Sequence, residues 1–151
     1  MSLTYVSAEL RRIVAGRSQG LCEYCLISEE FARLGCALDH IISEKHRGPT
    51  EADNLANACV ICNRAKESDI GSIHWDSGEF VRFFNPRKDL WADHFVLVEA
   101  RIDSTTRIGA VTALILGFND PERLSEREEL IVGGCYPSAA AKKRMEKNLN
   151  C

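Results

Sequence analysis

Residues 22–66 carry the most specific pattern in the sequence and read CEYCLISEEFARLGCALDHIISEKHRGPTEADNLANACVICNRAK. It begins with one C-x-x-C pair, Cys22 and Cys25, and a second pair, Cys59 and Cys62, lies near its end. This spacing lets a single turn present two sulfurs to one metal ion. Two such pairs supply the four thiolates of a closed, tetrahedral zinc site, which is structural rather than catalytic.

The alternatives to a zinc site are a redox dithiol and a set of four unrelated buried cysteines. The chain has seven cysteines, and an odd number argues against a complete disulfide framework. In a reducing compartment, closely spaced cysteines are better explained by a metal than by bridges. The two pairs flank residues 26–58, an insertion long enough to hold its own strand and loop.

Three short elements in and around this insertion carry polar groups. Asp39 and His40 lie at the end of an apolar run over residues 34–42, which is typical of a strand. Asn54 follows a loop imposed by Gly48-Pro49, and Asn63 directly follows the last cysteine at the start of an expected helix. Each element alone is a weak signal, but their order between the cysteine pairs is specific.

This arrangement resembles the HNH endonucleases of the ββα-metal type, in the subgroup whose motif is flanked by two C-x-x-C knuckles. The residues that carry the resemblance are Cys22, Cys25, Asp39, His40, Asn54, Leu55, Cys59, Cys62, Asn63 and Lys66. The third motif position holds Asn63 instead of a second histidine, so the chain is an H-N-N variant. The resemblance implies an α+β fold with a ββα-metal (His-Me finger) core and a structural zinc held by four cysteines. It also implies that the side chain of Asn54 braces the loop beside the histidine.

The motif residues are suited to hydrolysis of a phosphodiester. His40 is the one motif side chain with an ordinary pKa near neutrality, so we expect it to act as the general base toward water. Asp39 and Asn63 offer oxygen ligands, which suit Mg²⁺ or Mn²⁺. On a regular strand, however, neighbouring side chains point to opposite faces, so Asp39 and His40 can serve one phosphate only if the strand ends, twists or bulges there.

The rest of the chain predicts hairpins and helices. We expect a helix over residues 7–17, a short motif helix near residues 64–67, a hairpin over 72–84 and a second hairpin over 95–107 with its turn at Asp103-Ser104. Helices are expected over 109–118 and 121–132, the latter with Pro121 in its first turn. We divide the chain into a nuclease domain at 1–95, a hairpin and helical extension at 96–135 packed on it, and a partly ordered basic tail at 136–151.

The formal net charge is −3, which argues weakly against extensive nucleic-acid binding. Acidic residues are unevenly distributed, however, and the segment 80–88 contains three basic residues and no acidic one. We therefore expect a positive groove with modest, salt-sensitive affinity for DNA. The candidate nucleic-acid-binding residues are Lys45, Arg47, Arg64, Lys66, Arg82, Arg87 and Lys88.

The leading interpretation is a DNA endonuclease that uses a structural Zn²⁺ and one catalytic Mg²⁺ or Mn²⁺. The alternatives are a non-catalytic zinc-ribbon module that binds DNA or a protein, and, less favoured, a thiol redox protein. The longest apolar runs, such as residues 110–118, are too short to span a bilayer, so we expect a cytoplasmic protein with no membrane partner. The sequence does not specify an oligomeric state.

Overall fold

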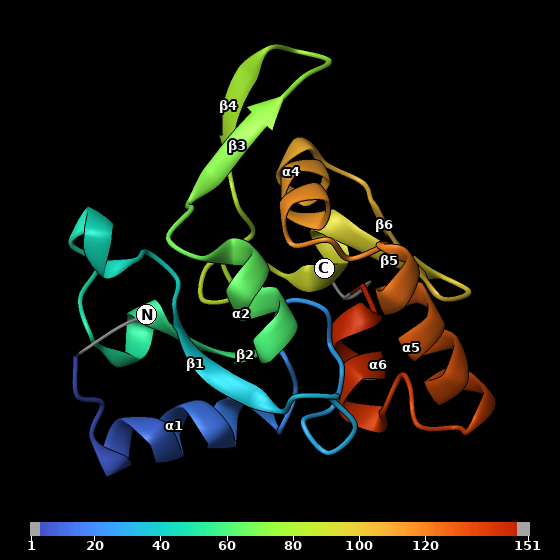
Figure 1. Ribbon diagram of the computed structural model, residues 1–151, viewed down its shortest axis with the longest axis horizontal. Helices are drawn as coiled ribbons and strands as arrows, with labels where there is room; N and C mark the ends of the chain where they lie inside the picture. The colour runs from blue at the N-terminus through green and yellow to red at the C-terminus, as the bar shows by residue number, and fades with distance from the viewer. Residues whose placement is uncertain (1–3, 148–151) are drawn as a thin grey trace.

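The computed structural model describes residues 4–147 and has a mixed α+β architecture, which confirms the predicted fold class. Within this range there are three two-stranded antiparallel sheets. The strands are β1 Cys36–His40, β2 Leu55–Cys59, β3 Gly71–His74, β4 Glu79–Arg82, β5 Phe95–Val98 and β6 Arg101–Ser104. The helices are α1 Ala8–Ser18, α2 Val60–Lys66, α3 Trp91–His94, α4 Arg107–Ile115, α5 Pro121–Val132 and α6 Ala139–Met145, with 3-10 turns η1 Glu44–His46 and η2 Ala52–Asn54. Helices pack beside the β1–β2 and β5–β6 sheets, and the β3–β4 sheet projects from the body (Figure 1).

Strands β1 and β2 and helix α2 form a ββα unit. The strands pair antiparallel, with Cys36 opposite Cys59 at one end and His40 opposite Leu55 at the other. Helix α2 starts immediately after β2, and Cys59 is its N-cap residue. The ββα unit therefore has a cysteine end and a His40 end, separated by four residues of strand, or about 13 Å.

Helix α1 packs against β2 and confirms the helix predicted over residues 7–17. Ser7 caps it, because its Oγ accepts a hydrogen bond from the Leu10 N–H at 3.2 Å. Val14 is buried in a small apolar cluster that includes Leu55 of β2. This cluster anchors the N-terminal helix to the hairpin that carries His40.

The second half of the chain shares one core with the ββα unit. A single buried cluster extends from Leu21 to Ala141, and its centre is aromatic. Phe95 packs edge-on against Phe84, with ring centroids 5.5 Å apart, and also contacts Trp91 and Phe118. The β3–β4 hairpin projects from this body at the top of Figure 1 and confirms the hairpin predicted over residues 72–84.

Helix α5 has the predicted bounds, whereas three other predicted elements differ from the structure. The motif helix begins at Val60, not near Arg64, because Cys59 ends β2 and caps α2 directly. The turn of the β5–β6 hairpin is at residues 99–100, not at 103–104, because Val98 pairs with Arg101. Helix α4 begins two residues earlier than predicted, because the side chain of Thr106 caps it.

The described part of the basic tail, up to residue 147, is a packed element. Tyr136 is 3% exposed and donates its hydroxyl hydrogen to the Cys25 carbonyl at 2.9 Å. Helix α6 follows, and Ala141 within it is fully buried. The segment was expected to be only partly ordered, whereas up to residue 147 it is packed, because Tyr136 and Ala141, which precede its cations, bury against the core. Within residues 4–147, no helix is long and apolar enough to cross a membrane.

Candidate functional site

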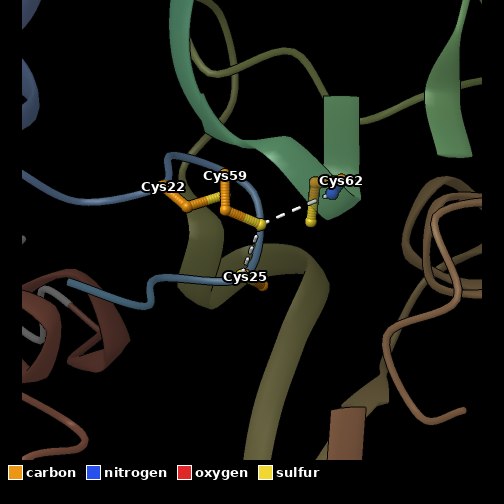
Figure 2. A group of neighbouring side chains, drawn as sticks. All are labelled: Cys22, Cys25, Cys59 and Cys62. Atoms are coloured by element: carbon orange, nitrogen blue, oxygen red, sulfur yellow. Dashed lines mark hydrogen bonds between the residues drawn. The ribbon is translucent and has the colours of Figure 1, made fainter. Parts of the chain in front are cut away.

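The four cysteines of the two C-x-x-C pairs meet in one buried cluster (Figure 2), which we call the cysteine cluster. Their sulfur atoms all lie within 4.8 Å of one another. The Cys25 and Cys59 sulfurs are 3.8 Å apart. A tetrahedron with Zn–S bonds of about 2.3 Å has edges of about 3.8 Å, so this separation fits a shared zinc ion. The described cysteines are free thiols, which excludes a disulfide between the pairs.

The ionisation of the cysteine cluster also fits a bound cation. Burial raises the pKa of the Cys22 thiol well above its ordinary range. Hydrogen bonds from Cys22 and the other two thiols lower the pKa of the Cys25 thiol well below that range. Four neighbouring thiols therefore cannot all ionise without a compensating positive charge. A zinc ion supplies that charge and needs all four as thiolates, so the donor set could hold a structural zinc.

Backbone hydrogen bonds and dihedral angles fix the two C-x-x-C turns that form the cluster. In the first knuckle, the Leu26 N–H donates to the Cys22 carbonyl at 2.9 Å, and Leu26 has a left-handed backbone with φ of 63°. In the second, the Cys62 N–H donates to the Cys59 Sγ at 3.4 Å. The sulfur thus satisfies one of the free N–H groups at the start of α2, so a candidate metal ligand is also a helix cap.

At the opposite end of the ββα unit, the carboxylate of Asp39 is enclosed. It is 3% exposed, and its Oδ2 accepts a hydrogen bond from the Tyr24 hydroxyl at 2.6 Å. Its Oδ1 lies 3.2 Å from the Nζ of Lys66, which also donates to the His40 carbonyl at 3.0 Å. Burial raises the pKa of Asp39, although the Lys66 charge and the Tyr24 hydrogen bond oppose the shift.

His40 is the last residue of β1, and its ring lies among loop residues. Its Nε2 is 2.9 Å from the Thr50 Oγ1 and 3.4 Å from the Glu44 Oε1. The side chain is 9% exposed, at the boundary between core and surface. Neighbouring residues on β1 therefore have different surroundings: Asp39 contacts Tyr24 and α2, whereas His40 contacts the loop that carries η1. Strand β1 ends at His40, which is one of the conditions under which the two side chains can serve one phosphate.

The loop beside His40 is held by Asn54, as the resemblance implies. The Asn54 Oδ1 accepts a hydrogen bond from the Ile42 N–H, and its Nδ2 donates to the carbonyls of Ile42 and Pro49, all at 2.9 Å. Gly48 allows this close packing, because a Cβ there would lie 1.7 Å from the Ile42 carbonyl oxygen. One buried amide thus joins both ends of the loop between β1 and η2.

Asn63 lies half-buried in α2, directly after the cluster residue Cys62. Lys66 is one turn further along the same helix face and contacts Asp39. The start of α2 therefore carries the second cysteine pair and Asn63, and its last turn contacts β1 at Asp39 and His40. Movement of either end of α2 would move the other.

The candidate nucleic-acid-binding residues fall into two groups. Lys45, Arg47, Arg64 and Lys88 are exposed or half-buried, and no protein partner holds their charges among the ion pairs of the described chain. Three others have protein partners: Lys66 is 1% exposed beside Asp39, Arg82 pairs with Asp89 through two hydrogen bonds at 2.7 and 2.9 Å, and Arg87 pairs with the buried Glu23. The expectation that Lys66 faces DNA was wrong, because its ammonium is buried and pairs with the Asp39 carboxylate.

Sequence reasoning missed three residues that support the site. Tyr24 lies between the two ligands of the first knuckle and holds Asp39. Glu23 is 1% exposed and pairs with Arg87 and Arg144. Arg123 of α5 donates hydrogen bonds to the cysteine cluster. Tyr24 and Glu23 lie between two candidate metal ligands in the sequence, and this position could have indicated their role. Nothing in the sequence near Arg123 indicated a contact with the cluster.

Comparison with known proteins agrees with this geometry. Residues 22–69 match the sequence model of the HNH endonuclease family. The resemblance to HNH endonucleases is confirmed. The HNH segment, as we call residues 22–69, contains the cysteine cluster, both strands of the ββα unit and α2. No curated protein and no solved structure matches the chain. The HNH match supports a nuclease-type function in general and a nucleic acid as the class of substrate.

Proposed function

We propose that the protein is a metal-dependent endonuclease that hydrolyses DNA phosphodiester bonds, with His40 as general base and one divalent ion. One observation carries this proposal: the HNH match coincides with a ββα unit whose cysteine end can hold zinc and whose other end places His40 at a strand terminus. A structural metal at the cysteine end would stabilise the unit, and the titratable His40 at the other end would carry out the reaction.

His40 has the surroundings that a general base needs. The contact between its Nε2 and the Thr50 hydroxyl fixes the plane of the ring. When the ring takes a proton from the attacking water, the Glu44 carboxylate at 3.4 Å stabilises the imidazolium that forms. The hydrogen bonds of Asn54 hold the loop that carries these partners, so Asn54 acts as a positioning residue.

Asp39 and Asn63 would hold the divalent ion, with water and phosphate oxygens as the remaining ligands. When bound, the ion supplies Lewis-acid stabilisation of the phosphorane and of the leaving 3′ oxygen. Lys66 is already the positive neighbour of the Asp39 Oδ1, so it is the group with which the ion competes for this carboxylate. Carboxylate and amide oxygens fit Mg²⁺ or Mn²⁺ better than they fit zinc.

The surface cations of the HNH segment are suited to holding DNA phosphates. Lys45 and Arg47 flank His46 in and just after η1, the turn that also supplies Glu44 beside His40. Arg64 is exposed on α2 one residue after Asn63. Few cations on a chain with a net charge of −3 imply modest affinity that falls with salt, with a slope set by the small number of phosphate contacts.

The second candidate is a non-catalytic zinc-ribbon module that binds DNA or a protein. The enclosure of Asp39 by Tyr24 and Lys66 favours it, because a buried ion pair can serve packing alone. A single assay separates the two functions. Supercoiled plasmid is incubated with the protein and Mg²⁺ or Mn²⁺, beside His40→Ala and beside a sample with excess EDTA added only during the assay.

A nuclease converts the plasmid to nicked or linear forms with 5′-phosphate ends, and both the His40→Ala variant and EDTA abolish conversion. The zinc content of each sample is measured, so that loss of the structural ion is not mistaken for loss of the catalytic one. Equal plasmid conversion by the parent protein and His40→Ala, or none by either, supports the binding module.

A further inference from the structure

Arg123, which lies outside the HNH segment, places its guanidinium against the cysteine cluster. Its Nη2 is 3.1 Å from the Cys25 Sγ and 3.6 Å from the Cys59 Sγ, and its Nη1 is 3.5 Å from the Cys62 Sγ. The planar, forked guanidinium thus donates to three of the four sulfurs at once. A lysine ammonium on a single stem cannot present donors over the same span.

The position of Arg123 is fixed by its own helix. It lies in the first turn of α5, where its N–H donates to the Asp120 carbonyl at 2.9 Å. Glu126, one turn later, has its Oε1 3.5 Å from the Arg123 Nε. Arg123 is 4% exposed and Glu126 is 8% exposed, so both charges are withdrawn from water. A buried arginine is costly unless strong partners compensate it, and the thiolates are such partners.

The negative charge of a zinc site with four thiolates gives a physical reason for the contact between Arg123 and the sulfurs. One Zn²⁺ and four thiolates carry a net charge of about −2 in a place from which water is excluded. An adjacent guanidinium halves this charge, and its N–H···S hydrogen bonds withdraw electron density from the sulfurs. Groups that contact ligand atoms in this way commonly change metal affinity by about 10- to 100-fold.

We propose that Arg123 is an outer-sphere partner of the cysteine cluster and controls how firmly the cluster retains zinc. The metal site is then completed by residues beyond position 69, so α5 of the C-terminal extension belongs to it. This inference rests on zinc occupancy of the cluster and not on nuclease activity. It gives α5 a role that its sequence pattern does not show.

The test is the rate at which the zinc-loaded, full-length protein transfers zinc to a colorimetric chelator. Arg123→Met removes charge and donors, whereas Arg123→Lys keeps the charge but loses the fork. Arg101→Met is the matched control, because Arg101 is 55% exposed and contacts only Asp103 among the ion pairs of the described chain. We expect transfer about tenfold faster or more for Arg123→Met, an intermediate rate for Arg123→Lys and the parent rate for Arg101→Met.

The second readout is the sulfur-to-metal charge-transfer band of the Co²⁺-substituted protein, which does not depend on DNA cleavage. Loss of the N–H···S bonds makes the sulfurs stronger donors, so the band moves to lower energy in Arg123→Met and less so in Arg123→Lys. If Arg123→Met does not fold, the zinc-transfer rate and band position of Arg123→Lys, compared with those of the parent protein, test the proposal. A band and transfer rate equal to those of the parent in the folded Arg123 variant would overturn the proposal, as would a purified parent protein that binds no zinc.

Discussion

The two ends of the ββα unit are built from the same strands and helix, yet they differ in how they are closed. At the cysteine end, four sulfur atoms lie together, and Arg123 donates hydrogen bonds to three of them. The His40 end has an inner part, where Tyr24 and Lys66 hold Asp39, and an outer part, where His40 meets the η1 loop. One end is thus closed around four sulfurs that could hold a metal, whereas the other leaves His40 at the boundary between core and surface.

The largest effect at the His40 end is expected from Lys66→Met. Removing the ammonium leaves the Asp39 carboxylate buried beside only the Tyr24 hydroxyl. An uncompensated buried charge of this kind costs about 3 kcal/mol or more. Urea unfolding of the zinc-saturated variant measures this loss.

The double variant Asp39→Asn/Lys66→Met is the control for that measurement. Because it removes both charges, it should lose less stability than the sum of the two single variants. Additive losses would show that the two side chains do not interact, and the buried inner part of the His40 end would then be misassigned.

Much of this architecture was predictable from sequence, because the deciding signals were local. Helix α5 was predicted with its observed bounds, since Pro121 marks its first turn and Gly133 follows its last residue. The cysteine cluster followed from spacing alone. The contacts of Asn54 followed from the HNH resemblance and not from the surrounding residues.

The remaining features depend on tertiary packing, which the sequence does not display. Lys66 reads as a surface cation of a short helix, and only the approach of α2 to β1 buries it. Arg123 lies in an acidic helix, and only the docking of α5 brings it to the sulfurs. The β5–β6 turn was misplaced because Glu99, not a glycine, adopts the left-handed backbone there, with φ of 57°.

Gly48→Ala tests whether the outer part of the His40 end depends on its loop. The added Cβ would lie 1.7 Å from the Ile42 carbonyl oxygen and 2.8 Å from the Asn54 Nδ2, so the loop must shift. We expect a loss of about 2 kcal/mol in unfolding free energy and faster hydrogen exchange of the Ile42 amide.

Gly16→Ala is the matched control for this substitution. Beyond its chain neighbours and the backbone of its own helix, no heavy atom of the described residues lies within 4 Å of a Cβ at Gly16, so this change within α1 should be neutral or slightly stabilising. Unchanged exchange at Ile42 in Gly48→Ala would show that the loop is not held as described.

The smallest effects are expected from removing one hydroxyl at each end of the unit. Tyr24→Phe loses the bond to the Asp39 Oδ2, and Tyr136→Phe loses the bond to the Cys25 carbonyl. Tyr24→Phe should cost about 1.5 kcal/mol in thermal or urea unfolding, because its partner is a carboxylate, and Tyr136→Phe about 1 kcal/mol. The proposed nuclease distinguishes them: plasmid cleavage should fall in Tyr24→Phe and stay at the parent rate in Tyr136→Phe. Equal effects on cleavage would remove the functional difference between the ends.

Helix α2 connects the two ends, because its first turn carries Cys62 and Asn63 and its last turn holds Asp39. The most direct test withdraws zinc stepwise with a chelator, restores excess Mg²⁺, and measures bound zinc and plasmid cleavage on the same samples. If the two ends are coupled, we expect cleavage to fall in proportion to bound zinc and to return when zinc is added back. Cleavage that persists at the parent rate after verified loss of zinc would contradict it.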